Sequence, residues 1–392
     1  LDGSMFHRGP FADWPVSLVG NNDVLCLTAP EVITDIHRRY IAAGADIITT
    51  NTFSANRISQ REYHCESQAR EMAMEGARIA RKVADGCKER KIWVAGSMGP
   101  TSKSLSLASD MNEPAERAID FDEMAAAYGE QAEALVQGGA DVLLLETCFD
   151  ALNTKAALYA IQLLNERLGR VLPVMVSVTI NDRSGRTLTG QTLEAFYVSI
   201  AHYPILSFGL NCSFGVVDLR PFVERLAAMI PAYISLHPNA GLPNEMGEYE
   251  ELPEFTAAHL RQLAEAGLLN IAGGCCGTDD HHVRAISEAL KGLPPRLLPE
   301  ADHRMWVSGL EPLLIDRQTQ NFINVGERTN VAGSRKFARL IAAKSYDEAM
   351  QVARQQIEGG AAVIDINMDD AMLDSRTEMR AFTRYLANDP AV

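Results

Sequence analysis

The stretch FDEMAAAYGEQAEALVQGGADVLLLET, residues 121–147, shows the pattern that decides the fold. Residues 121–139 have the spacing of an amphipathic helix and end at two glycines, where a helix C-cap is expected. Residues 140–147 form a short apolar run, which predicts a buried strand. A helix followed by a buried strand is typical of parallel βα units.

The same alternation recurs through roughly the first 290 residues. Other strand-like runs lie at residues 45–53, 91–100, 173–180, 207–215, 232–241 and 268–277, and LDG at 1–3 resembles the stub of one more. The amphipathic segments 29–44 and 253–267 also end at glycine. Counting the stub gives eight strands, so the sequence predicts a (β/α)8 TIM barrel rather than an open doubly wound sheet.

The repeat stops in a segment rich in proline and charge, residues 293–320. We therefore predict a barrel domain at 1–292, an interdomain linker at 293–320 and a second domain at 321–392. In the last domain, NFINVGERTN (321–330), two helical stretches and AAVIDINMDD (361–370) predict strand–helix–strand. We expect a second, truncated (β/α)8 barrel whose other strands lie beyond Val392, in a chain that is a fragment of a longer protein.

Composition narrows the class of ligand. The net charge of -15 argues against a nucleic-acid partner and favours small metabolites, and no apolar run is long enough to predict a membrane span. The seven cysteines are an odd number without the spacing of a disulfide framework. This pattern predicts a reducing compartment, the cytoplasm.

Polar side chains at the carboxyl ends of the strands are the candidates for a barrel's active site. They are Asp2, Thr50, Asn51, Ser97, Glu146, Thr179, Asn211, Cys212, His237, Asn239, Cys275 and Cys276. A barrel would bring Cys212 to the same end as the adjacent pair Cys275 and Cys276, although Cys212 is far from them in sequence. Three thiolates with an open fourth position are typical of catalytic zinc, and the glycines around the pair would let both neighbours turn toward one ion.

The residues alone leave other interpretations open. The adjacent cysteines could form a redox disulfide, or the three could bind a structural metal. We interpret Cys26, Cys65, Cys87 and Cys148 as small core residues, with Cys148 the alternative fourth ligand. Glu146 could bind a cationic group at the mouth or lie on a surface loop, and we favour the mouth.

Several segments resemble the homocysteine S-methyltransferase family, in the form found in cobalamin-dependent methionine synthases. They are LDGSM, GADIITTNTF, GADVLLLETCFD, SGRTLTGQT, GLNCSFG, HPNAGLPN and NIAGGCCGT. The segments SGLEPL, FINVGERTNVAGSRKFARLI and VIDINMDDAMLD resemble the start of the methyltetrahydrofolate-binding barrel that follows in those enzymes. The resemblance covers essentially the whole chain.

The resemblance implies that Cys212, Cys275 and Cys276 bind zinc and that the homocysteine sulfur takes the fourth position. It also implies that four positions hold the amino-acid end of homocysteine: Asp2, Gly3, Thr50 and Glu146. For folate it implies Gly333, Ser334 and Arg335, with Asp365 and Asn367 on the pterin side.

The implied reaction is methyl transfer from methylcobalamin to homocysteine, which gives methionine, with 5-methyltetrahydrofolate regenerating the methyl donor. The cobalamin would be bound by a further module, which is the implied partner and is not visible in this sequence. Two alternatives are a cobalamin-independent, betaine-type homocysteine methyltransferase and a non-catalytic barrel with a structural metal. The segment NVGERTN argues against the betaine type, since a stand-alone enzyme has no use for it.

The sequence departs from the family pattern at two places. The family's first strand continues as GMGT and a long segment, so we expect a segment to be missing between Met5 and Phe6. Thr49 stands where methionine synthases usually carry Glu before TNTF. We expect this change to alter hydrogen bonding near Thr50 without affecting the cysteines.

Overall fold

A computed structural model describes residues 2–110, 112–389 and 391–392. The chain forms two compact units. The first comprises Leu1–Lys103, Phe121–His303 and Ser308–Pro312, and the second comprises Ser104–Asp120, Arg304–Val307 and Leu313–Val392.

The first unit contains a sheet of seven parallel strands, which pair in chain order. They are β1 (Ile47–Thr49), β2 (Trp93–Met98), β3 (Val142–Cys148), β4 (Val174–Val178), β5 (Ser207–Asn211), β6 (Tyr233–His237) and β7 (Ile271–Ala272). Each predicted run from residue 45 to residue 277 overlaps one of them. This order and direction are those of a TIM-like barrel.

The sheet is curled, because residues from its two ends meet. Ala95, Val142, Leu144 and Met175 form a buried cluster inside it. Ile47 of β1 and Ile271 of β7 both pack against this cluster. The interior is therefore a filled core, as in barrels of this class.

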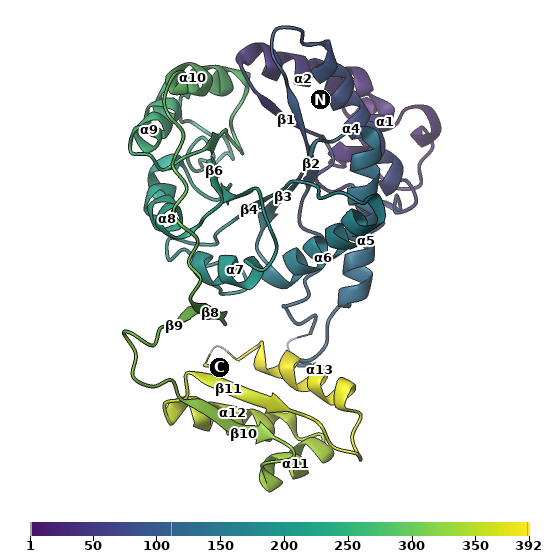
Figure 1. Ribbon diagram of the computed structural model, residues 1–392. Coiled ribbons are helices and arrows are strands. Elements are labelled where there is room, and N and C mark those ends of the chain that lie inside the picture. The colour runs from purple at the N-terminus through teal and green to yellow at the C-terminus, as the bar shows by residue number, and fades with distance from the viewer. Residues whose placement is uncertain (1, 111, 390) are drawn as a thin grey trace. The chain divides into compact units, whose positions relative to one another are not determined.

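Helices surround the sheet and form a ring (Figure 1). They are α2 (Pro30–Ala43), α4 (Ala69–Gly86), α5 (Phe121–Gly138), α6 (Ala151–Leu168), α7 (Leu193–Ile200), α8 (Val216–Met229), α9 (Pro253–Glu265) and α10 (Asp280–Leu290), with the short α1 (Leu25–Thr28) and α3 (Arg57–Gln60). The three helices predicted at 29–44, 121–139 and 253–267 are confirmed. Helix α10 packs against α2, so the ring of helices closes between the two ends of the sheet.

The stub at residues 1–3 is not a strand, which corrects the count of eight to seven among the described residues. Leu1 lies outside these residues, and Asp2 is the N-cap of a 3-10 helix, Gly3–Phe6. The Asp2 carboxylate accepts hydrogen bonds from the N–H (3.2 Å) and the hydroxyl (2.7 Å) of Ser4. A short Asp-Gly-Ser segment favours this local capping, because its side chains compete with strand pairing for the backbone.

The second unit contains the predicted strand–helix–strand. Strands β10 (Val325–Asn330) and β11 (Val363–Asn367) are parallel, and α11 (Arg335–Ala342), α12 (Tyr346–Glu358) and α13 (Ser375–Leu386) accompany them. Phe337 and Phe382 meet edge to face in its core. The described sheet of this unit has two strands, so a second barrel is not shown.

The predicted linker holds a further element. Strands β8 (Met305–Ser308) and β9 (Pro312–Ile315) form a two-stranded sheet within residues 293–320, which the sequence did not predict. Among the described residues, no helix is both long and apolar enough to cross a membrane.

Candidate metal and substrate site

The three predicted zinc cysteines meet at the carboxyl ends of β5 and β7. Cys212 directly follows β5, and Cys275 and Cys276 follow β7 by a few residues. The three Sγ atoms all lie within 4.8 Å of one another, and those of Cys212 and Cys276 are 3.6 Å apart. Tetrahedral zinc with Zn–S bonds of about 2.3 Å requires sulfurs about 3.8 Å apart. These separations therefore fit three sulfur ligands of one zinc ion.

Local backbone geometry produces this convergence. Cys212 and Ser213 both have φ of 66°, a left-handed conformation that is uncommon for residues other than glycine. Strand β7 ends at Ala272, so both following cysteines lie outside regular strand geometry. The N–H of Cys275 donates to Pro238 O (2.8 Å), and the N–H of Cys276 donates to Asn239 Oδ1 (3.1 Å). Backbone strain of this kind is concentrated at functional sites.

The pKa values of the cysteine thiols are shifted in opposite directions by their mutual contacts. Hydrogen bonds from Cys275 and Cys276 stabilise a thiolate at Cys212 and lower its pKa. The same contact with Cys212 raises the pKa of Cys275, because a second negative sulfur there would repel the first. A bound divalent cation reverses this repulsion, since it stabilises thiolates directly.

Asn211 links the cysteine cluster to two neighbouring strands. Its Oδ1 accepts from the N–H of Thr147 (2.9 Å) and the hydroxyl of Ser177 (2.7 Å). Its Nδ2 donates to Thr147 Oγ1 (2.8 Å) and approaches the Sγ of Cys275 at 3.8 Å. Thr147 has a left-handed φ of 56°, which this amide holds in place. The side chain is 3% exposed, so these bonds are protected from water.

Glu146 lies near the carboxyl end of β3 and is partly exposed. Its Oε1 accepts a hydrogen bond from the Ser97 hydroxyl. Burial raises the pKa of Glu146, the Ser97 hydrogen bond opposes this, and the negative charge of Cys212 raises the pKa further. The Glu146 carboxylate thus lies close enough to Cys212 for the two charges to interact.

The other predicted homocysteine positions fall into two groups. Thr50 is buried, and its Oγ1 accepts from the N–H of Ser97 at 2.9 Å. One hydrogen-bond network therefore joins Thr50 and Glu146 through Ser97. The described hydrogen bonds of Asp2 are instead within its own 3-10 helix, which also contains Gly3.

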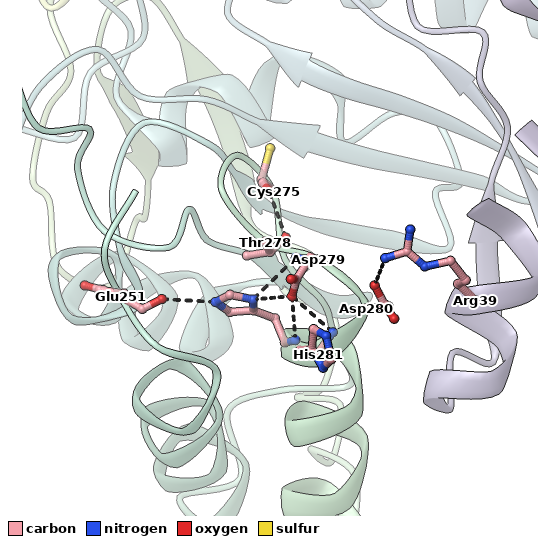
Figure 2. Close-up of polar contacts among 8 residues, drawn as sticks. Arg39, Glu251, Cys275, Thr278, Asp279, Asp280 and His281 are labelled. Carbon is pink, nitrogen blue, oxygen red and sulfur yellow. Dashed lines mark hydrogen bonds and ion pairs between the residues drawn. The ribbon is translucent and has the colours of Figure 1, made fainter. Parts of the chain in front are cut away.

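Residues next to the cysteine pair that were not predicted to matter form hydrogen bonds around this turn. His282, for which no role was predicted, is 7% exposed. Its Nδ1 lies 2.8 Å from Asp279 Oδ1, and its Nε2 donates to Glu251 O at 3.1 Å. Figure 2 shows Asp279 and Glu251 together with Thr278, whose hydroxyl donates to Cys275 O (2.7 Å). The spacing of Asp279 and His282 at the start of α10 is a capping box, a signal that could have been recognised.

The start of α10 also bears an exposed charged contact. Asp280 pairs with Arg39 of α2, as Figure 2 shows. Asp279, Asp280 and His281 lie close enough together to be considered for a metal ion. Asp279 already caps the helix and Asp280 already binds Arg39, so their contacts have a structural explanation.

The predicted folate residues lie between β10 and α11. Ser334 is the N-cap of α11, where its side chain accepts from Phe337 N–H (3.3 Å), and Arg335 is the first helical residue. Gly333 donates its N–H to Asn330 Oδ1 (3.0 Å) and lines a cavity of about 430 Å³ beside β10. The pterin-side candidates Asp365 and Asn367 belong to the neighbouring β11, whose register pairs Asn367 with Asn330.

Two family models match the chain. Residues 1–290 match homocysteine S-methyltransferase, and residues 326–391 match pterin binding enzyme. The chain therefore belongs to the homocysteine S-methyltransferase family, which supports a methyltransferase acting on homocysteine. The second match supports a ligand related to folate.

Solved structures show the same fold. The homocysteine methyltransferase MmuM from Escherichia coli, in its oxidized form, is 20% identical with a TM-score of 0.57, over 71% of this chain and 90% of that chain. Its metallated form is 20% identical with a TM-score of 0.52, over 67% and 86% of the two chains. At these identities the likeness concerns the fold alone.

Proposed function

We propose that this chain methylates homocysteine to methionine as part of a cobalamin-dependent methionine synthase. Methylcobalamin would be the methyl donor and 5-methyltetrahydrofolate would regenerate it. The observation that carries the proposal is the convergence of three cysteine sulfurs at one end of a barrel in this family. The pterin-binding match after the barrel supports the folate-dependent route over a betaine-type enzyme.

We propose zinc as the metal and Cys212, Cys275 and Cys276 as its ligands. Zinc would supply a Lewis acid that lowers the pKa of the substrate thiol, so that the sulfur is a nucleophile at neutral pH. Three thiolates are soft, negatively charged ligands, which suits a site that must keep a further sulfur electron-rich. Asn211 and Asn239 would hold the cysteine backbone and side chains in position through the contacts described above.

The amino-acid end of homocysteine would bind beside the cysteines. Glu146 offers a carboxylate for its ammonium group, and Thr50 belongs to the same network. Asp2 and Gly3 would complete this subsite from the N-terminal segment. Gly333, Ser334 and Arg335 would contact folate.

The proposal also concerns domain organisation. Residues 1–292 would be the homocysteine domain, 293–320 the linker and 321–392 the first part of the folate domain. A cobalamin-binding module of the whole enzyme would be the partner that delivers the methyl group. The seven free cysteines support a cytoplasmic location.

The test is zinc content and methyl transfer after reconstitution, measured for the chain and for Cys276→Ser. The variant should lose most zinc and nearly all homocysteine methylation by free methylcobalamin. Cys87→Ser is the matched control, because Cys87 is a half-buried cysteine outside the cluster, and it should keep both. Full zinc and full activity in Cys276→Ser would contradict the proposal.

A further inference from the structure

Ser97 is hydrogen-bonded to two of the four proposed homocysteine contacts, Thr50 and Glu146. It belongs to β2 and is 1% exposed. Its hydroxyl donates to Oε1 of Glu146 on β3, while its backbone N–H donates to Thr50 Oγ1, just after β1, at 2.9 Å. This one residue therefore connects three successive strand ends.

Both peptide groups of Ser97 are fixed by buried partners. Its carbonyl oxygen accepts from Thr52 Oγ1 at 2.8 Å, and Thr52 Oγ1 also lies 2.6 Å from Thr50 Oγ1. Gln131 of α5 donates to Thr52 O at 2.8 Å and to Ser97 O at 3.3 Å. A serine held in this way presents its hydroxyl from a defined position.

The Glu146 carboxylate is stabilised from one side only. In residues 2–110, 112–389 and 391–392, the Ser97 hydroxyl donates to it, and no lysine, arginine or histidine forms an ion pair with it. A carboxylate withdrawn from water is costly without a cation or further donors. Because the side chain is partly exposed, a cationic group of a ligand can supply what the protein does not.

We propose that Ser97 is a positioning residue that makes the site selective for thiols carrying an α-ammonium group. It holds Oε1, fixes the plane of the Glu146 carboxylate and leaves Oε2 for the ammonium group. This inference rests on the proposed function, because it assigns the thiol to the cysteine cluster. It concerns recognition of the amino group and not the activation of the sulfur.

The test compares the Kd of homocysteine with that of its deamino analogue, by calorimetry on the zinc-reconstituted chain. Ser97→Ala should weaken homocysteine binding by about tenfold, the loss expected for one hydrogen bond to a charged group. Binding of the deamino analogue should change by less than about twofold. Ser235→Ala is the control, since Ser235 is a buried serine of β6 whose hydroxyl lacks a partner in the described part of the chain.

A double-mutant cycle separates positioning from a general structural effect. In a Glu146→Gln background, Ser97→Ala should not reduce the preference for homocysteine further, because the charge it positions is gone. If Ser97→Ala fails to fold, Ser97→Thr can be compared with Ser97→Val. Threonine and valine have the same shape, and a hydroxyl in threonine replaces a methyl in valine. The threonine variant should then keep the preference and the valine variant should lose it.

The outcomes distinguish the inference from the proposed function. Equal weakening of both thiols by Ser97→Ala, or unchanged homocysteine binding, would overturn the inference and leave the proposed function standing. If the unaltered chain bound neither thiol, both would be overturned.

Discussion

Gly277, next to the cysteine pair, gives a sharp test of how the turn is built. It has φ of 77°, and a Cβ added there would lie 2.3 Å from Cγ of Tyr249. An alanine must therefore bear the left-handed backbone cost of about 1–2 kcal/mol and an overpacking cost of about 1–3 kcal/mol. We expect Gly277→Ala to lower the free energy of unfolding by about 3 kcal/mol and to weaken metal binding, because Cys276 is adjacent.

Gly267 provides the matched control. Its φ of 70° is similar, but an added Cβ there meets nothing within 4 Å. Gly267→Ala should show the backbone cost alone, about 1–2 kcal/mol, with unchanged metal affinity. The assay is urea unfolding followed by circular dichroism, together with competition against a chelator for the metal. Equal losses at the two glycines, or unchanged metal affinity in Gly277→Ala, would refute this account of the turn.

Three further predictions concern buried polar groups. Asn211→Ala should lower the free energy of unfolding, measured in urea, by about 2–4 kcal/mol, because the N–H of Thr147 loses its acceptor. The control Asn181→Ala, at an exposed site, should change it by less than about 0.5 kcal/mol. Burial raises the pKa of Asp23 to about 6, so the folded state keeps a proton that the unfolded state releases, and the stability should fall by about 2 kcal/mol as pH rises from 4 to 7. Asp23→Asn should flatten this dependence, and an unchanged pH profile would contradict it. His282→Ala should remove the hydrogen bond to Glu251 O and make the segment around it more mobile. Amide hydrogen exchange should then be faster at residues 240–252. Unchanged protection would show that the imidazole does not stabilise this segment.

Much of the fold could be predicted because its signals are local. Helical spacing ended by glycine located α2, α5 and α9, and apolar runs located the seven strands of the first unit's sheet. The stub at residues 1–3 failed because three residues carry no periodicity, and Asp2 instead satisfies the nearby backbone. The sheet of β8 and β9 was missed because the prolines and charges around it resemble those of a linker.

In the candidate site too, some features could be predicted from the sequence and others could not. The convergence of the three cysteine side chains could be predicted because the barrel places strand ends at one mouth. The amide of Asn211 could not be assigned a role, since it acts through partners distant in sequence. The capping contact of His282 with Asp279 is local and could have been recognised, but its contact with Glu251 is distant in sequence and could not. Ser97 was on the candidate list, but only the structure shows that it joins Thr50 to Glu146.

The most direct test of the central claim is X-ray absorption spectroscopy at the zinc edge, with and without homocysteine. The account predicts three sulfur ligands at about 2.3 Å for the reconstituted chain and four when homocysteine is added. Two or fewer sulfurs, or a coordination shell that homocysteine does not change, would contradict it.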